Sequence, residues 1–224
     1  MINALPPFDS PLEANLRSSV LQRIRLEIVS GKTRPGEILT VPTLAKAWGS
    51  STTPVREALL ELSNQGLLEP LRNRGFRVCI PTAEDLKNLF AIRVQLEGYA
   101  ITSVDNISEN AVAELRLHAQ EIADAVTARD TFKYLAADRA FHYTLISLAG
   151  NERLTKMIMN LRDNMRLYGI ESPAGMERQA LSVDEHFQLV DVIISGDKQR
   201  ALSLMKTHIL DWEPIFLDAI EADL

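Results

Sequence analysis

The chain has 224 residues, of which 46% are hydrophobic and 24% are charged, and its net charge is −6. This balance excludes a disordered chain and is sufficient for one large or two small folded domains. The single cysteine, Cys79, excludes an internal disulfide and any metal cluster held by several cysteines.

The N-terminal residues and the hydropathy of the chain bear on its location. Residues 1–10 lack the basic stretch and apolar run of a secretory signal. The sequence also has no run of about 18 apolar residues that would span a membrane. We therefore expect a cytoplasmic protein with no membrane partner.

The net charge of the whole chain hides a division. Residues 15–81 carry ten Lys or Arg and five acidic residues, whereas residues 82–224 carry a net charge of −9. A basic segment followed by an acidic one predicts two domains with different partners, and chance clustering of charge is the alternative. We expect an N-terminal extension at 1–14, a first domain at 15–81 and a second at 82–224.

Three helices and a hairpin are predicted in the first domain. The expected helices lie at 16–29, around 44–48 and from 54 until Gly66, and the strands lie at 67–69 and 76–80. The third helix follows a cluster of capping residues, and its Val55, Leu59 and Leu62 form one apolar stripe. The tip at 72–75 contains Asn and Gly, as hairpin turns require. This order of elements predicts a winged helix-turn-helix.

Six helices are predicted in the second domain, where no strand-like alternation occurs. They lie at 83–103, 108–128, 131–148, 152–169, 183–195 and 198–221. Thr82 to Asp85 resembles a capping box for the first of these helices, with Asp in place of the usual Glu or Gln. Ser182 to Glu185 has the spacing of a capping box for the fifth helix, after a loop at 171–175. The predicted fold is mainly α, a winged helix-turn-helix followed by an antiparallel, all-helical bundle.

Candidate DNA-binding residues follow from this fold, because the second helix of a helix-turn-helix places its N-terminal end in the major groove. Arginines at a wing tip suit the electronegative minor groove. The candidates are Ser51, Thr52, Thr53 and Arg56 at the third helix, and Arg72, Arg74, Gly75 and Arg77 in the hairpin. The alternative is that the arginines are solvated or paired with acidic neighbours.

The first domain resembles the GntR family of bacterial transcription regulators. The resemblance rests on residues 34–37, 53–59, 66–68 and 73–75, which keep the order of the family pattern. It implies a dimeric repressor or activator that binds a two-fold-related, double-stranded DNA operator. The family commonly has Arg before Thr53, where this chain has Thr52, so the base contact of that position is not carried over.

A second group of residues has the chemistry of a metal site. Asp138 and His142 are four residues apart in one predicted helix and therefore share a face. With His186 and His208 they form a donor set that suits Zn²⁺, Ni²⁺, Mn²⁺ or Fe²⁺, and not Mg²⁺ or Ca²⁺. The alternative is that the histidines are exposed or satisfied within the core. The fourth histidine, His118, has polar neighbours and is expected at the surface.

The second domain resembles the FCD effector domain of the FadR branch of the family. The resemblance covers 83–215 and includes 93–97, 148–151 and the spacings around the three histidines. Six helices resemble the VanR-type subgroup. The resemblance implies that Asp138, His142, His186 and His208 bind a divalent metal and that a small organic acid reaches that metal. We expect a transition metal, zinc in the first place and otherwise nickel, manganese or iron.

Arginines of the second domain are candidates for binding the carboxylate of this effector. Arg93 is the first candidate, and an ion pair with Glu97 four residues later is its alternative. Arg162 and Arg166 are weaker candidates, for which a solvated helix face is the alternative.

These observations predict a ligand-responsive transcription regulator that is not an enzyme. Two alternatives stay open: a metalloenzyme with an appended DNA-binding domain, and a constitutive DNA-binding dimer with a structural metal. The sequence contains no His-Glu-x-x-His motif that would favour the enzyme.

Overall fold

The structure, a computed structural model, describes residues 13–29, 32–80, 82–165 and 169–222. Within this part the chain divides into two units after Ile80. The predicted N-terminal extension lies almost entirely outside the described residues, as does Pro81. Among the described helices, none has the length and apolarity needed to cross a membrane.

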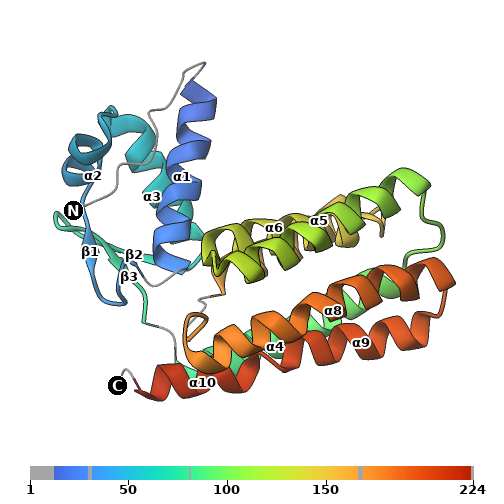
Figure 1. Cartoon of the computed structure of the whole chain (residues 1–224). Helices are drawn as coiled ribbons and strands as arrows, with labels where there is room; N and C mark the ends of the chain where they lie inside the picture. The colour runs from blue at the N-terminus through green and yellow to red at the C-terminus, as the bar shows by residue number, and fades with distance from the viewer. Residues whose placement is uncertain (1–12, 30–31, 81, 166–168, 223–224) are drawn as a thin grey trace. The chain divides into compact units, whose positions relative to one another are not determined.

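Three helices form the core of the first unit (Figure 1). They are α1 (Glu13–Val29), α2 (Val41–Trp48) and α3 (Thr52–Asn64). The Thr40 hydroxyl caps α2, and Gly49 ends this helix in the left-handed conformation. The predicted stripe of α3 is fully buried and packs in one cluster with the apolar face of α1. This burial holds α3 by one side and leaves Thr52, Thr53 and Arg56 exposed.

A three-stranded antiparallel sheet completes the first unit. Its strands are β1 (Ile38–Leu39), β2 (Leu68–Leu71) and β3 (Gly75–Val78), in the order β1-β3-β2. The predicted hairpin is β2 and β3, whereas β1 was not predicted because two residues show no alternation. Gly75 has a φ of +114°, and a Cβ there would collide with the backbone oxygen of Leu39. Glycine is therefore required for β1 to approach β3.

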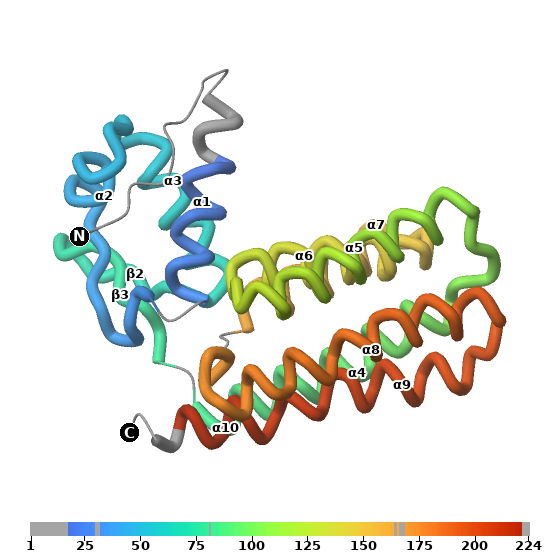
Figure 2. Tube along the Cα trace, in the orientation of Figure 1, coloured from blue at the N-terminus to red at the C-terminus, as the bar shows by residue number. Residues whose placement is uncertain are grey.

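Seven helices form the described part of the second unit. They are α4 (Ala83–Thr102), α5 (Glu109–Ala128), α6 (Thr131–Ser147), α7 (Glu152–Asn164), α8 (Pro173–Ser195), α9 (Lys198–Leu210) and α10 (Glu213–Ala222). Figures 1 and 2 show α5, α6 and α7 on one side and α4, α8 and α9 on the other. The apolar core cluster takes buried side chains from both groups of helices. The predicted fold class, a winged helix-turn-helix followed by a helical bundle, is confirmed.

The capping box predicted for α4 is present. The backbone N–H of Asp85 donates to the Thr82 hydroxyl at 3.0 Å, and the N–H of Thr82 donates to the Asp85 carboxylate at 3.1 Å. Aspartate thus replaces the more usual Glu or Gln at this position.

The start of α8 was predicted wrongly. Ser172 caps this helix by accepting a hydrogen bond from Gly175, and Pro173 occupies a first-turn position that needs no N–H donor. Residues 173–175 of the predicted loop are therefore the beginning of the helix. Ser182 lies in the middle of α8, where its hydroxyl donates to the Gln179 carbonyl, so the predicted capping box is not formed.

The predicted helix at 198–221 is interrupted, so the described residues of this unit form seven helices and not the predicted six. The break falls at Asp211 and Trp212, between α9 and α10. Pro214 lacks the N–H that would donate to the Leu210 carbonyl, and its ring would clash with that carbonyl in a continuous helix.

We predict that Gly175→Ala destabilises the protein although alanine is the better helix former. A Cβ at Gly175 would collide with the backbone oxygens of Gly169 and Ile170, which cannot rotate away. We expect the free energy of unfolding, measured by urea denaturation, to fall by about 2–3 kcal/mol. Gly98→Ala is the matched control, because a Cβ there meets only the end of the Leu202 side chain. Equal stability of the two variants would contradict the prediction.

Candidate metal centre and nucleic-acid interface

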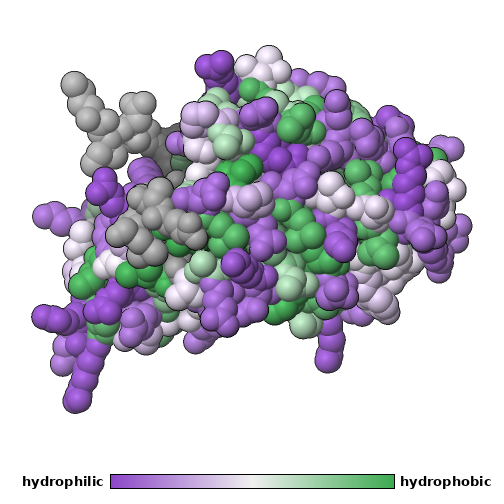
Figure 3. All heavy atoms as spheres, turned by 90° about the horizontal axis from the view of Figure 1, so that it is seen from below, coloured by the Kyte–Doolittle hydropathy of each residue, from purple (hydrophilic) through white to green (hydrophobic). Residues whose placement is uncertain are grey.

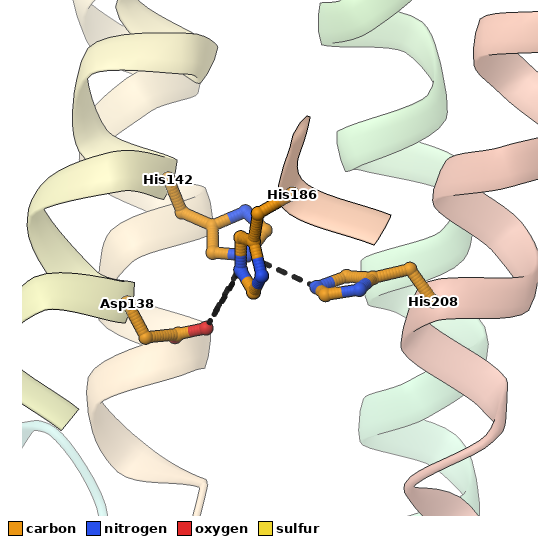
Figure 4. A group of neighbouring side chains, drawn as sticks. All are labelled: Asp138, His142, His186 and His208. Atoms are coloured by element: carbon orange, nitrogen blue, oxygen red, sulfur yellow. Dashed lines mark hydrogen bonds and ion pairs between the residues drawn. The ribbon is translucent and has the colours of Figure 1, made fainter. Parts of the chain in front are cut away.

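Four side chains from three helices converge in the second unit (Figure 4). Asp138 and His142 lie one turn apart on α6, His186 lies on α8 and His208 lies on α9. One ligand atom from each of them lies within 4.8 Å of the others. His142 Nε2 is 3.2 Å from His208 Nε2, and His186 Nε2 is 3.3 Å from Asp138 Oδ1. The structure thus brings together the four residues that the sequence analysis selected as ligands.

Hydrogen bonds at Nδ1 determine which ring nitrogen of His186 and of His208 faces the cluster. His186 Nδ1 lies 2.6 Å from the Ser182 carbonyl oxygen, and His208 Nδ1 lies 2.6 Å from Glu185 Oε2. Both oxygens accept hydrogen bonds, so each Nδ1 carries the proton and each Nε2 directs a lone pair at the cluster. His142 Nδ1 is buried and has no hydrogen-bond partner among the described residues.

A buried arginine links the cluster to α4. Arg162 on α7 donates to Asp138 Oδ2 at 3.0 Å and to Glu97 Oε2 at 2.8 Å. Burial opposes the charge of Glu97, but Arg162 and Arg93 outweigh burial and lower its pKa to about 2. Burial likewise opposes the charge of Asp138, but His142 and Arg162 hold its pKa well below the usual value. Both carboxylates are therefore ionised at neutral pH.

The histidines of the cluster are buried. Burial, with the positive charge of Arg162, lowers the pKa of His142 to about 3. Burial lowers the pKa of His208 to about 4, although the Glu185 carboxylate opposes this shift. Both rings are neutral at pH 7, which is the form that binds metals.

The donor set fits a divalent transition metal. Neighbouring ligand atoms are separated by 3.2, 3.3 and 3.6 Å. Such separations match the edges of a site whose metal–ligand bonds are about 2.0–2.2 Å long. Three imidazoles and one carboxylate leave further coordination positions for a bound acid or water.

Two residues beside the cluster were not selected from the sequence, Arg178 and Glu185. Glu185 accepts hydrogen bonds from both His208 and Arg178. Glu185 was assigned to a capping box that does not form, and Arg178 was placed before the predicted helix. With the true start of α8, the spacing of Arg178, Ser182 and His186 at four-residue intervals would have placed all three on one face.

Two of the three candidate effector-binding arginines, Arg93 and Arg162, belong to the charged network beside the cluster. Arg93 is buried, and its Nε donates to Glu97 Oε1 at 2.7 Å, so the ion pair named as its alternative is present. Arg162 is mostly buried and paired with two carboxylates, so it does not lie on a solvated face. Arg166 lies outside the described residues.

The candidate DNA-binding residues lie on the surface of the first unit. Ser51 precedes α3 without a side-chain cap, and Thr52, Thr53 and Arg56 are exposed on its first turns. Arg72 and Arg74 are exposed in the turn between β2 and β3, and Gly75 begins β3. Arg77 on β3 lies 3.6 Å from Glu69, an exposed ion pair that leaves both side chains partly open to solvent.

Both units match known protein families. Residues 16–78 match the family described as "Bacterial regulatory proteins, gntR family", and residues 88–211 match the family described as "FCD domain". The second match covers the four residues of the cluster.

The relatives over most of the chain are transcription regulators. The chain is 30% identical to the uncharacterized regulator BphR of Paraburkholderia xenovorans, over 88% of this chain and 84% of that protein. It is 24% identical to the transcriptional repressor GlaR of Escherichia coli, over 88% of this chain and 94% of that protein. These relatives are named as regulators and not as enzymes, which agrees with the expectation for this chain.

The fold is similar to that of solved regulators. The structure matches a GntR regulator from Rhodococcus sp. RHA1 with a TM-score of 0.75 and 25% identity, over 92% of this chain and 99% of that chain.

We predict that the metal-free protein loses stability between pH 7 and pH 5. The pKa values of His142 and His208 are about 3 and about 4, below the usual 6.5. As the pH falls below 6.5, the unfolded chain takes up protons that the folded chain does not, so unfolding is favoured until the folded pKa is reached. We expect a loss of about 2 kcal/mol for each histidine in urea denaturation after chelator treatment.

The variant His142→Gln is the control for this pH dependence, because glutamine does not titrate. Between pH 7 and pH 5 its unfolding free energy is expected to change by about half as much as that of the wild type. A wild-type unfolding free energy that is constant between pH 7 and pH 5 would contradict the prediction.

Proposed function

Since the chain belongs to the GntR family of bacterial regulatory proteins and carries an FCD domain, it is a DNA-binding transcriptional regulator, and we propose that a small organic acid controls it. The proposed acid binds at a metal in the second unit and changes the affinity of the dimer for its operator. The observation that supports this proposal is the convergence of three buried histidines and Asp138 inside the FCD match.

The proposed DNA contacts come from α3 and the wing. The apolar stripe of α3 is buried, so Thr52, Thr53 and Arg56 are free to enter the major groove. The Ser51 hydroxyl does not cap α3, so it is available to a phosphate, as are the N–H groups of the first turn. Arg72 and Arg74 at the wing tip reach the minor groove or its phosphates, and Arg77 and Gly75 support that tip.

The proposed metal ligands are Asp138, His142, His186 and His208, and zinc is the proposed metal. When bound, a divalent metal supplies positive charge and open coordination positions for an acid. The chain itself contributes orientation: Ser182 and Glu185 hold two imidazoles with Nε2 toward the cluster. Arg162 holds one oxygen of Asp138 and leaves the other, Oδ1, for the metal.

Arg93 and Arg162 provide the positive charge that attracts the carboxylate of the effector toward the cluster. For the acid to regulate DNA binding, it must bind one arrangement of the dimer more tightly than the other. Tight binding to both arrangements would not change operator affinity.

Exposed apolar side chains of the second unit support a homodimer. Ile92 and Tyr99 lie two turns apart on α4 and are 48% and 61% exposed, and Leu202 on α9 is 40% exposed. Figure 3 shows hydrophobic side chains among hydrophilic ones on the face seen from below the view of Figure 1. Burial of such side chains against a second copy would stabilise a dimer.

We predict that His142→Ala removes the metal. Elemental analysis of the purified wild-type protein is expected to find about one transition-metal ion per chain, and the variant less than about one tenth of that, since one of four ligands is lost. His118→Ala is the matched control, because His118 contacts Glu114 and Glu121 away from the cluster and its loss leaves the metal content unchanged. A wild-type protein that neither contains nor takes up stoichiometric metal would refute the metal site.

We predict that Arg56→Ala weakens binding to DNA from the protein's own promoter region. The expected loss of affinity, measured by fluorescence anisotropy, is about 5- to 100-fold. Binding of the wild type should also weaken steeply as salt increases, because phosphate contacts release counterions. Lys87→Ala removes an equal charge from α4 of the other unit and is expected to bind as the wild type does.

Retained affinity in Arg56→Ala would exclude a contact by this side chain. No binding of the wild type to this DNA at low salt would contradict the proposed operator. An operator affinity that does not respond to organic acids would favour the constitutive dimer with a structural metal.

A further inference from the structure

Arg178 is a buried cation with unused hydrogen-bonding capacity. The residue lies on α8 and is 4% exposed. The central carbon of its guanidinium is 5.6 Å from the centroid of the Trp212 ring. Its Nη2 donates to Glu185 Oε2 at 2.5 Å and approaches the His208 carbonyl at 3.4 Å. Its Nε and Nη1 have no hydrogen-bond partner within the described part of the chain.

The other two buried arginines of this region differ from Arg178. Arg93 uses Nε and Nη1, and Arg162 uses both terminal nitrogens, on protein groups. An unpartnered N–H of a buried guanidinium is costly, and an anion is the partner that satisfies it best. Of these three arginines, Arg178 is therefore the one most available to a ligand.

Arg178 lies on the same helix face as the metal cluster. Arg178, Ser182 and His186 follow at four-residue intervals on α8, and Tyr134, Asp138 and His142 do so on α6. The two rows face each other, since the Ser182 and Tyr134 hydroxyls are 3.1 Å apart and His186 reaches Asp138. Burial raises the pKa of Tyr134, so its phenol remains a neutral hydrogen-bond donor. The row of polar side chains that runs along α8 from the cluster thus ends at Arg178.

The buried charges also constrain the ligand. The cluster and the charged side chains linked to it include three arginines and three carboxylates, namely Arg93, Arg162, Arg178, Glu97, Asp138 and Glu185. These six charges cancel, and imidazoles that bind a metal through Nε2 are neutral. A divalent metal would therefore leave two uncompensated positive charges in a buried region, where such charges are costly.

We propose that the effector is a dianion, a dicarboxylic acid, with one carboxylate at the metal cluster and the other paired with Arg178. This proposal rests on the metal site and the organic-acid effector proposed above. A dianion neutralises the two remaining charges and supplies the acceptor that Arg178 Nε and Nη1 lack. A monocarboxylate leaves one charge and these N–H groups uncompensated.

The test is calorimetric titration of the zinc-loaded protein with the straight-chain dicarboxylates from malonate to adipate. Each dicarboxylate is compared with the monocarboxylate of equal carbon number. We expect at least one dicarboxylate to bind the wild type about 10- to 100-fold more tightly than its monocarboxylate, the range for a charge-assisted pair. Equal affinity for the two series would overturn the proposal.

Arg178→Gln tests the residue itself. It is expected to reduce the preference for dicarboxylates to less than about 3-fold, since the charge is gone, while the metal content stays that of the wild type. Arg178→Lys keeps the charge and should retain part of the preference, which also covers the case in which the glutamine variant fails to fold. Arg116→Gln, which removes an exposed arginine paired with Asp191, is the control that should bind as the wild type does.

Two outcomes separate this inference from the proposed function. If the wild-type protein binds no metal, or if the metal-loaded protein binds no acid, the proposed function fails. If it binds metal and acids but Arg178→Gln weakens both series equally, or loses the metal, Arg178 only positions Glu185 and His208. That result would overturn the inference and leave the metal site in place.

Discussion

Arg162 provides the interaction on which the polar centre of the helical unit depends. Glu97 has no exposed surface, and a buried carboxylate is stable only when it is paired and hydrogen-bonded. Arg162 reaches from α7 to Glu97 on α4 and to Asp138 on α6, and so allows both acids to remain ionised. The same contact orients Asp138, because it occupies one carboxylate oxygen and leaves the other toward the histidines. Charge compensation and ligand orientation are therefore provided by one side chain.

The histidine cluster is built across the bundle rather than along one helix. α6 and α8 each present a row of polar residues at four-residue spacing, and these rows meet through His186 and Asp138. His208 completes the cluster from α9, and Glu185 ties that ring back to α8. The apolar core surrounds this polar centre, so its hydrogen bonds and charges act in a medium of low dielectric constant. This burial explains why the pKa values of His142 and His208 are low.

Local rules predicted most of the fold. The stripe of α3, the capping box of Thr82 and Asp85 and the wing turn depend on residues close in sequence, and each was found as predicted. The start of α8 was missed because Ser182 and Glu185 imitate a helix start within a helix. There, the Ser182 hydroxyl bonds to the preceding turn and Glu185 bonds to His208 and Arg178. The strand β1 was missed because it exists only through pairing with β3.

The sequence by itself determined which residues carry the chemistry. The basic charge of residues 15–81, the four-residue spacing of Asp138 and His142 and the two further histidines are properties of the chain alone. Only the tertiary structure decided how these groups are paired, because pairing depends on burial and on helices far apart in sequence. It placed Arg93 against Glu97, an alternative that spacing left open. It also placed Arg162 against Glu97 at the polar centre, where spacing had allowed a solvated face. It also buried Arg178 with N–H donors that have no partner among the described residues, which no local pattern indicates.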